Sequence, residues 1–180
     1  MTYIALLRGI NVGGNNKIPM SELKEIFEQA GMHTISTYIN SGNVLFQSDE
    51  SNKTVLAAIL EEAIALRYGF AVKVLVLAKQ DMLAIAKALP KEWTNDTTMK
   101  CDVLFLWESI DSPDIVKEFT IKAGIDTVKY VPGAVLWAID RKQATKSGLY
   151  KIVGTPIYKQ MTVRNCNTLR RLVILLNDTV

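Results

Sequence analysis

The chain has 180 residues, of which 49% are hydrophobic and 22% are charged, and its formal net charge is +3. These values are typical of a soluble globular protein with one sizeable core or two small ones. No apolar stretch approaches the roughly 18–20 residues of a membrane span, and residues 1–8 lack the basic lead and cleavage site of a signal peptide, so we predict a cytoplasmic protein without a membrane partner.

The first half of the chain is predicted to alternate strands with helices. Its expected elements are, in chain order, a strand at residues 2–8, a helix at 19–30, strands at 34–40 and 43–47, a long helix that Gly69 ends, a strand at 72–78 and a helix at 79–89. Pro19 and Gly31 stand where helix ends favour proline and glycine, and Ser41-Gly42 predicts a two-residue hairpin turn.

The long helix of this half also shows an apolar stripe. Asp49 or Ser51 is expected to cap its start, because short polar side chains accept hydrogen bonds from the first turn of a helix. The residues that repeat at helical spacing, and so indicate the face toward the core, are Val55, Ile59, Ala63 and Leu66.

Residues 91–100 are polar and have no sustained period, which predicts a link between two halves. The elements expected after this link are a strand at 101–107, a helix from Ser112 to Gly124, strands at 126–131 and 134–140 around a Pro132-Gly133 turn, a helix at 145–153, a strand near 161–163 and a final helix at 168–176. Each half then has the order β-α-β-β-α-β followed by a helix.

This order predicts an α+β protein of two tandem ferredoxin-like halves, with residues 1–90 as the first half, 91–100 as the linker and 101–180 as the second half. Three of the predicted strands, at 72–77, 103–107 and 134–139, are apolar almost without alternation, which indicates that both faces of each sheet are covered. We therefore expect the two halves to pack against each other, in preference to two separate domains on a flexible link.

The loop between the first strand and the first helix carries the components of an anion site. Its glycines let backbone N–H groups converge, the start of the helix adds positive potential, and Arg8 and Lys17 add full charges. The segment is not a P-loop, because Asn15 stands where that motif requires lysine. An alternative hypothesis stays open, in which the glycines and asparagines, Asn11 among them, only satisfy unusual backbone angles.

Charge is distributed unevenly along the chain. Residues 1–140 hold 13 basic against 17 acidic side chains, or −4, whereas residues 141–180 hold 8 against 1, or +7. The last helix carries Arg170 and Arg171 in its first turn, where the helix dipole favours acids by about 0.3–1 kcal/mol. Two explanations stay open: an external phosphate or carboxylate neutralises these arginines, or they pair with acids from residues 1–140.

The hairpin turn of the first half supplies a third candidate segment. Asn40, Ser41 and Asn43 present amides and a hydroxyl beside the first loop in the functional interpretation. Hairpin formation alone also explains asparagine and glycine at these positions.

Metal and thiol chemistry find little support in the sequence. His33 is the single histidine, and Cys101 and Cys166 lie far apart in no metal or redox spacing. Cys166 is near a helix start and cations that could lower a thiol pKa, but no base is placed beside it. We predict no metal, no cofactor and two free thiols in a reducing compartment, with Cys166 as a small buried residue.

Several segments together resemble a known family. They are Ala5-Leu6-Leu7-Arg8-Gly9-Ile10-Asn11-Val12-Gly13-Gly14 with Lys17 and Met20, Tyr38 with Ser41-Gly42-Asn43-Val44, and Arg164-Asn165 with Asn167-Thr168. On these motifs the chain is identified as a member of the bacterial family named domain of unknown function 1697, and the resemblance covers nearly its whole length. The resemblance implies a two-part α+β protein of ferredoxin-like subdomains without an assigned activity, so it supports the fold and supplies no reaction.

The leading functional hypothesis is a protein that binds a phosphate-bearing or other anionic small molecule. The alternatives are a nucleic-acid-binding protein that uses the basic segment, and an enzyme of phosphoryl or acyl transfer, for which no general base or nucleophile is evident. The residues predicted to bind the ligand are Arg8, Asn11, Gly13, Gly14, Lys17, Asn40, Ser41, Asn43, Arg164, Asn165, Asn167 and Arg170. This hypothesis requires two distant stretches of the chain to form one electropositive hollow.

Overall fold

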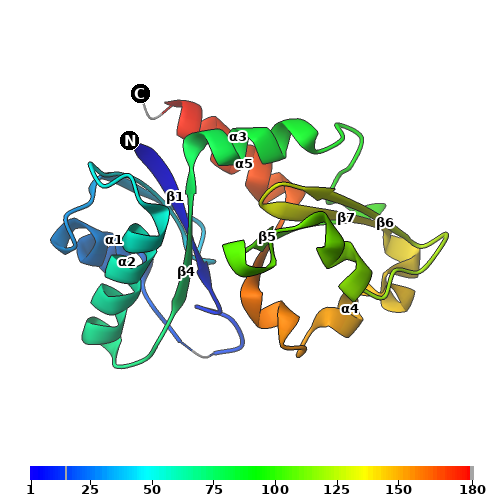
Figure 1. Cartoon of the computed structure of the whole chain (residues 1–180), viewed down its shortest axis with the longest axis horizontal. Coiled ribbons are helices and arrows are strands. Elements are labelled where there is room, and N and C mark those ends of the chain that lie inside the picture. The colour runs from blue at the N-terminus through cyan, green and yellow to red at the C-terminus, as the bar shows by residue number, and fades with distance from the viewer. Residues whose placement is uncertain (15, 179–180) are drawn as a thin grey trace. The chain divides into compact units, whose positions relative to one another are not determined.

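The structure is a computed structural model that describes residues 1–14 and 16–178. It has mixed α and β structure, with two four-stranded antiparallel sheets and several helices (Figure 1). The chain divides into two compact units, Met1–Gln80 and Asp81–Val180. Helix α3 (Lys79–Ala88) begins at the end of the first unit and continues into the second, whereas the sequence placed this helix in a first half that ended at residue 90.

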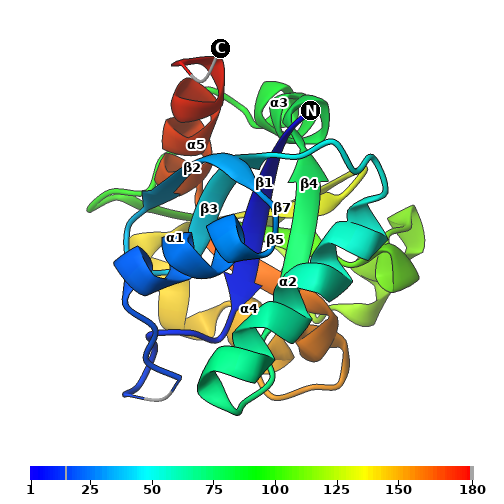
Figure 2. The same cartoon turned by 90° about the vertical axis from the view of Figure 1, so that its left-hand side faces the viewer.

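The first unit is a four-stranded sheet with two helices on one face. Its elements before α3 are β1 (Thr2–Arg8), α1 (Met20–Gln29), β2 (His33–Tyr38), β3 (Asn43–Gln47), α2 (Lys53–Tyr68) and β4 (Lys73–Ala78). The strand order is β2-β3-β1-β4, and every neighbouring pair is antiparallel. Figure 2 shows α1 and α2 over the same face of this sheet. Each strand and helix predicted for the first half is present, with small shifts at its ends.

The core of the first unit lies between its sheet and the two helices. Alternate residues of β1, namely Tyr3, Ala5 and Leu7, belong to this core, as the two-residue period of a strand requires. Burying one large apolar side chain stabilises a fold by about 1.5–3 kcal/mol. The helical residues that add to this stabilisation are Leu23, Ile26 and Phe27 from α1, and Leu56, Leu60 and Ile64 from α2.

Helix α2 turns a different face to the core from the predicted one. The predicted stripe is mostly exposed, and Leu66, its last member, is 81% exposed. The helix is apolar nearly all round, so two stripes at helical spacing compete for the core, and only tertiary contacts select between them. The residues actually buried, Leu56, Leu60 and Ile64, each lie one position further along the helix than Val55, Ile59 and Ala63.

The ends of α2 depend on Asn52 and Gly69. The Oδ1 of Asn52 accepts a hydrogen bond from the N–H of Thr54 at 2.9 Å. The cap is therefore neither Asp49 nor Ser51, the two residues that the sequence suggested, because the helix begins later than expected. Gly69 ends the helix as predicted, with φ of 74°, in the left-handed region that glycine enters without steric penalty.

The connection between β2 and β3 has four residues, and the predicted two-residue turn is wrong. Strand β2 ends at Tyr38, which pairs with Asn43, so residues 39–42 form the turn. Ile39 and Gly42 both have positive φ, 47° and 73°. Sequence rules do not anticipate this conformation for a β-branched residue, since its side chain clashes there.

The second unit repeats the strand order of the first with shorter helices. Its elements after α3 are β5 (Met99–Leu106), the 3-10 helices η1 (Glu108–Ile110) and η2 (Pro113–Glu118), β6 (Asp126–Val131), β7 (Ala134–Asp140), η3 (Arg141–Lys146), α4 (Leu149–Ile152), η4 (Ile157–Gln160), β8 (Met161–Asn165) and α5 (Cys166–Asp178). The order is β6-β7-β5-β8, antiparallel throughout. The prediction of β6, β7 and their Pro132-Gly133 turn is confirmed residue for residue.

Two helices predicted for the second half are shorter than expected. Ser112 caps a helix as predicted, with Oγ accepting from the N–H of Asp114 at 3.1 Å, but that helix ends at Glu118 and not at Gly124. The helix predicted at 145–153 is replaced by η3 and the single turn α4. The predicted helix is interrupted because the Asp126 carboxylate accepts hydrogen bonds from Ser147 Oγ and the N–H of Gly148, which lie between η3 and α4.

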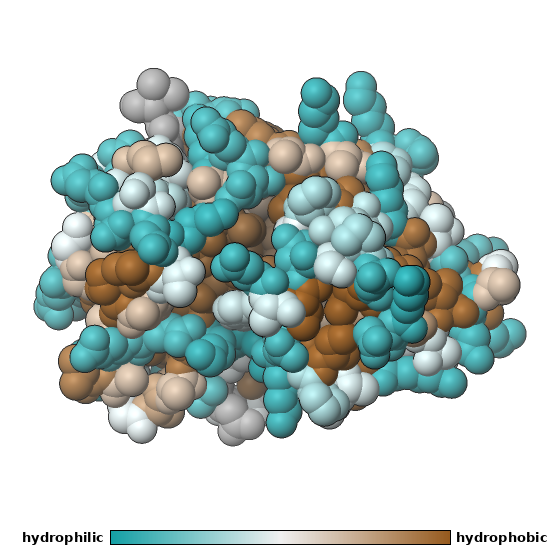
Figure 3. Space-filling view, in the orientation of Figure 1, coloured by the Kyte–Doolittle hydropathy of each residue, from teal (hydrophilic) through white to brown (hydrophobic). Residues whose placement is uncertain are grey.

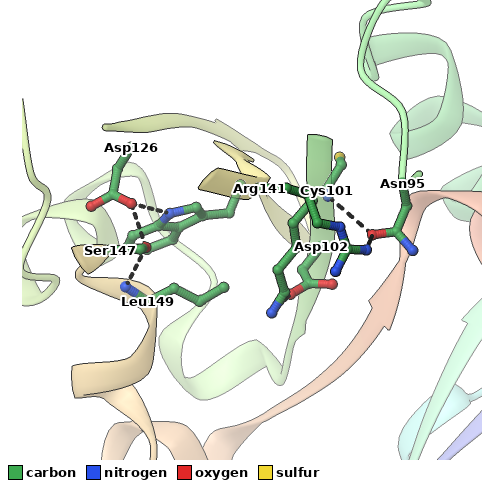
Figure 4. Close-up of polar contacts among 9 residues, drawn as sticks. Asn95, Cys101, Asp102, Asp126, Arg141, Ser147 and Leu149 are labelled. Atoms are coloured by element: carbon green, nitrogen blue, oxygen red, sulfur yellow. Dashed lines mark hydrogen bonds and ion pairs between the residues drawn. The ribbon is translucent and has the colours of Figure 1, made fainter. Parts of the chain in front are cut away.

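The Asp126 carboxylate accepts hydrogen bonds from four donors and is drawn in Figure 4. The donors are Ser147 Oγ, the N–H of Gly148 (2.9 Å), the N–H of Lys122 (2.8 Å) and Trp137 Nε1 (3.1 Å). Burial raises the pKa of Asp126, but these hydrogen bonds outweigh burial and hold the pKa below its usual value. A Cβ at Gly148 would lie 1.4 Å from the carbonyl oxygen of Thr120, so no other residue fits there.

The surface mixes polar and apolar side chains. Figure 3 shows hydrophilic residues interspersed with hydrophobic ones on the face seen in Figure 1. Within the described ranges, no helix is both long and apolar enough to cross a membrane. The expectation that the two halves pack against each other stays a prediction.

Candidate functional site

The loop between β1 and α1 is fastened by the side chain of Asn11. Its Oδ1 accepts a hydrogen bond from the N–H of Ile18 at 2.8 Å, and its Nδ2 donates to the carbonyl oxygens of Ile18 and Asn40, each at 2.9 Å. Asn11 also has a φ of 55°, which asparagine tolerates better than most residues. The side chain therefore ties the loop to the hairpin turn, the local role that the alternative hypothesis assigned to these asparagines.

These contacts leave a hollow at the start of α1, which we call the α1 hollow. Its volume is about 360 Å³, and it is lined by Asn11, Gly14, Lys17, Ile18, Pro19, Met20 and Asn40. The fold thus brings four of the predicted ligand residues around one opening: Asn11, Gly14, Lys17 and Asn40.

The α1 hollow combines a helix N-terminus with a lysine. Pro19 is the N-cap residue of α1 and makes no side-chain hydrogen bond to the first turn. The cap therefore supplies no acceptor for the N–H groups that an α-helix cannot bond internally. Lys17, which is exposed, adds a full positive charge to this end of the helix dipole. An anion is the chemical complement of such a site.

The acid in the first turn of α1 is engaged elsewhere. Glu22 accepts a hydrogen bond from the Tyr68 hydroxyl at 2.7 Å and pairs with Arg67 at 3.3 Å, both on α2. Burial and the bond to Glu22 raise the pKa of Tyr68 to about 12, so the hydroxyl stays a donor at neutral pH. The carboxylate that would repel an anion at this helix end is thereby partly compensated.

Gly13 and Gly14 serve the backbone of the loop. Their φ values are 62° and 82°, and a Cβ on either residue would meet open space. The requirement for glycine is therefore conformational, since other residues enter this region at a cost. Gly14 lines the α1 hollow, whereas the lining does not include Gly13.

The predicted hairpin residues divide into two groups. Asn43 is buried, and its Nδ2 donates to the carbonyl oxygen of Tyr38 at 3.0 Å and to Ser41 Oγ at 3.1 Å. These bonds stabilise the turn. Asn40 lines the α1 hollow, and the described lining contains neither Ser41 nor Asn43.

Arg8 lies at the end of β1, one residue beyond Leu7. Leu7 belongs to the core beneath α1 and α2, so strand alternation directs Arg8 to the opposite face of the sheet. Its backbone pairs with that of Lys73 on β4. Arg8 is not among the described residues that line the α1 hollow.

The start of α5 holds the second group of predicted residues. The Oδ1 of Asn165 accepts from the N–H of Thr168 at 2.9 Å, so Asn165 caps the start of this helix. The preceding residue, Arg164, is 9% exposed and donates through Nη1 to Thr162 Oγ1 at 3.0 Å and to the carbonyl oxygen of Val163 at 2.8 Å. Burial lowers the pKa of Arg164 to about 10, so it stays charged at neutral pH.

Arg170 has partners that the sequence did not suggest. Its Nη2 donates to the carbonyl oxygens of Pro90, Lys91 and Trp93 at 3.1, 3.4 and 2.8 Å. Asn167 donates to the carbonyl oxygen of Asn95 at 2.9 Å. Carbonyl oxygens carry partial negative charge, so those of residues 90–93 offset the repulsion between the Arg170 guanidinium and the positive end of the helix dipole.

The two groups of predicted residues belong to different units. Arg8 and the α1 hollow are in Met1–Gln80, whereas Arg164, Asn165, Asn167 and Arg170 are in Asp81–Val180. The hypothesis that both groups form one electropositive hollow stays a prediction.

Sequence reasoning missed the structural roles of the segment before β5. The Oδ1 of Asn95 accepts hydrogen bonds from the N–H of Cys101 at 3.4 Å and from Arg141 Nη2 at 3.2 Å (Figure 4). The polar composition of residues 91–100 predicted only a link between the two halves, because side-chain bonds to residues far along the chain leave no periodic signal. This segment is instead bound to the second unit at several points.

Comparison with known proteins supports a family and a fold. A family model described as "Protein of unknown function (DUF1697)" matches residues 1–137. A solved structure, described as that of the conserved bacterial protein SP0830 from Streptococcus pneumoniae, is similar over 97% of this chain and 98% of its own, with 30% sequence identity and a TM-score of 0.83. No curated protein matches the chain significantly.

Proposed function

The chain belongs to the DUF1697 family of proteins of unknown function, and we propose that it binds a phosphate-bearing or other anionic small molecule in the α1 hollow. The observation that carries this proposal is the meeting of Lys17 with the N-terminus of α1, whose Pro19 cap makes no side-chain hydrogen bond. The ligand's oxygens take the place of the missing cap acceptor.

The size of the hollow supports a small ligand. Its volume of about 360 Å³ lies toward the lower end of small-molecule sites, roughly 300–1,000 Å³. Ile18, Pro19 and Met20 add apolar lining beside Lys17. A ligand with an anionic group and a compact apolar part matches both kinds of surface.

Calorimetric titration with inorganic phosphate and with a nucleoside triphosphate tests the proposal. The variant Lys17→Gln removes one charge from the hollow, and Lys24→Gln, on the exposed surface of α1 and paired with Glu28 at 3.8 Å, is its matched control. A hydrogen bond to a charged group contributes about 1.5–3 kcal/mol, so Lys17→Gln should weaken binding roughly 10-fold to 100-fold. Lys24→Gln should leave affinity unchanged.

Equal affinity in the wild type and Lys17→Gln contradicts the site. If neither phosphate nor the nucleoside triphosphate binds saturably, the proposed ligand class is wrong. A double variant tests the finer prediction that Arg8 and Arg164 also contact the ligand. Arg8→Ala combined with Arg164→Ala should abolish binding if both groups form one hollow, and normal binding would restrict the site to the α1 hollow.

We also propose that each half is ferredoxin-like and that the protein is a bacterial cytoplasmic one. The first point is supported by the same antiparallel order in both sheets, β2-β3-β1-β4 and β6-β7-β5-β8, which matches a split β-α-β unit. The second is supported by the likeness to a Streptococcus pneumoniae protein and by two free cysteines, which are usual in a reducing compartment.

A further inference from the structure

The two cysteines of the chain, 65 positions apart in sequence, are neighbours in the second unit. Strand β5 pairs with β8 in antiparallel register, with Asp102 opposite Asn165. The residue before Asp102 is Cys101, and the residue after Asn165 is Cys166, the first of α5, so the two cysteines lie directly beyond the last pair of this ladder. Directly opposed residues in such a ladder have Cα atoms about 4.5–5.5 Å apart, within the roughly 4.4–6.8 Å that a disulfide spans.

The two side chains also lie on the same face of the sheet. Val103 pairs with Arg164, and each cysteine lies two residues from one member of that pair, so strand alternation gives all four one face. Both cysteines are buried and free. Each thiol shifts the pKa of the other, upward for Cys101 and downward for Cys166.

Cys166 has a distinct electrostatic setting. It is the first residue of α5, a 13-residue helix, so the positive end of the helix dipole lies at its sulfur. The Nη1 of Arg170, one turn further along, donates to Cys166 Sγ at 3.6 Å. The Cys166 thiol in turn donates to the carbonyl oxygen of Trp93 at 3.7 Å and to Asn167 Oδ1 at 3.8 Å.

We propose that Cys101 and Cys166 form a reversible intramolecular disulfide when the protein meets hydrogen peroxide. The Cys166 thiolate attacks one oxygen of the peroxide, which breaks the O–O bond and gives Cys166 sulfenic acid and hydroxide. The Cys101 sulfur, after losing its proton to that hydroxide, then attacks the sulfenic sulfur. The S–S bond forms as the S–O bond breaks, and the second oxygen leaves as hydroxide, which a proton converts to water.

The electrons and protons of these two steps balance. Two thiols lose two electrons and two protons, and one hydrogen peroxide is reduced to two waters. The order of attack follows from the surroundings of each sulfur. Cys166 lies at the helix end beside Arg170, which stabilise its thiolate, whereas the raised pKa of Cys101 keeps it protonated, so that it serves as the resolving thiol.

The directions of the two thiol pKa shifts support Cys166 as the attacking sulfur. The hydrogen bond from Cys101, and then Arg170, lower the pKa of Cys166 to about 7 against the opposing effects of burial and of Asp102. The bond to Cys166 and burial raise the pKa of Cys101. Asp102 is itself paired with Lys100 at 2.9 Å, which limits its effect on the sulfurs. The Cys166 thiolate is therefore favoured over that of Cys101, and the rate of oxidation should rise with pH as Cys166 ionises.

Intact-mass analysis of the full chain tests the proposal. The protein is treated with hydrogen peroxide, unfolded, and then alkylated with iodoacetamide. We expect the wild type to lose two hydrogens, to take up no alkyl group and to yield a peptide pair that links Cys101 to Cys166. Dithiothreitol should restore both alkylatable thiols.

Two single variants separate the roles of the sulfurs. Cys101→Ser should accumulate a sulfenic acid on Cys166 that dimedone traps, because the resolving thiol is absent. Cys166→Ser should keep Cys101 as an unmodified thiol under the same treatment. Circular dichroism compares the folds of both variants with that of the wild type.

Retention of both thiols in the wild type, under conditions that fully oxidise dithiothreitol, would overturn the proposal. Disulfide-linked dimers in place of the internal link would overturn it too. Trapping of a sulfenic acid on Cys101 and not on Cys166 would overturn the assignment of the attacking sulfur.

Discussion

The guanidinium of Arg170 donates a hydrogen bond to the main-chain carbonyl oxygen of Trp93 at 2.8 Å. This bond and its companions to Pro90 and Lys91 attach the segment after α3 to the start of α5. The charge of the last forty residues left two explanations open, an external anion or internal acids, and this arginine also bonds to main-chain carbonyl oxygens of its own unit. A basic segment is therefore weak evidence for a ligand until the partners of each side chain are known.

Arg170→Gln should lower the free energy of unfolding by about 1–3 kcal/mol, because part-buried carbonyl oxygens of Pro90 and Trp93 lose a charged donor. Arg171→Gln changes the same charge at the exposed neighbouring position and should stay within about 0.5 kcal/mol of the wild type. Urea denaturation of both variants measures the difference. Equal stability of the two would mean that the bonds of Arg170 contribute nothing to the fold.

Asn52→Ala should destabilise the first unit by about 1 kcal/mol through loss of the α2 cap. The control is Ser51→Ala, at the exposed adjacent position that the sequence suggested as a cap, and its effect should be within about 0.5 kcal/mol. Thermal unfolding of the two variants makes the comparison. A larger loss in Ser51→Ala than in Asn52→Ala would contradict the observed cap.

Gly148→Ala should destabilise the second unit by about 3 kcal/mol or more, because the added Cβ would overlap the Thr120 carbonyl oxygen. Gly154→Ala is the comparison, since its Cβ meets open space and only its φ of 86° opposes a side chain. That strain corresponds to about 1–2 kcal/mol. Chemical denaturation should rank the two variants in this order, and the reverse order would contradict the close approach at Gly148.

The stability of the second unit should fall in acid through Asp126. The pKa of Asp126 is lower in the folded protein than in the unfolded chain, where the pKa of aspartate is about 3.9. The stabilising effect is therefore present above the unfolded value and is lost as the pH falls through the folded one. Asp126→Asn should be less stable at pH 7 and should show a flatter decline between pH 5 and pH 2 in denaturation experiments. A variant with the slope of the wild type would assign the acid sensitivity to other carboxylates.

The fold could be predicted from local patterns where those patterns were unambiguous. The β6-β7 hairpin follows from two apolar runs on either side of Pro132-Gly133, and its ends agree with the structure. The core face of α2 could not be predicted, because Leu56 and Val55 belong to two stripes of the same spacing. Packing against β4 and α1 decides between those stripes.

The candidate site was predictable as a set of residue types and not as a geometry. Glycines, Asn11 and Lys17 at the start of a helix indicated an anion site, and the α1 hollow contains Asn11, Gly14 and Lys17. The bond from Asn11 to the carbonyl oxygen of Asn40 joins residues 29 positions apart. Contacts of this kind, like the adjacency of Cys101 and Cys166, depend on strand pairing and leave no signature in one sequence.

The most direct test of the account follows backbone amide resonances of the full chain during a titration with inorganic phosphate. If the α1 hollow binds an anion, saturable shifts should concentrate at Lys17, Met20 and Ser21, and Lys17→Gln should weaken the response about tenfold or more. Shifts that do not saturate, or that centre on residues outside the first turn of α1 and its preceding loop, would contradict the proposed site.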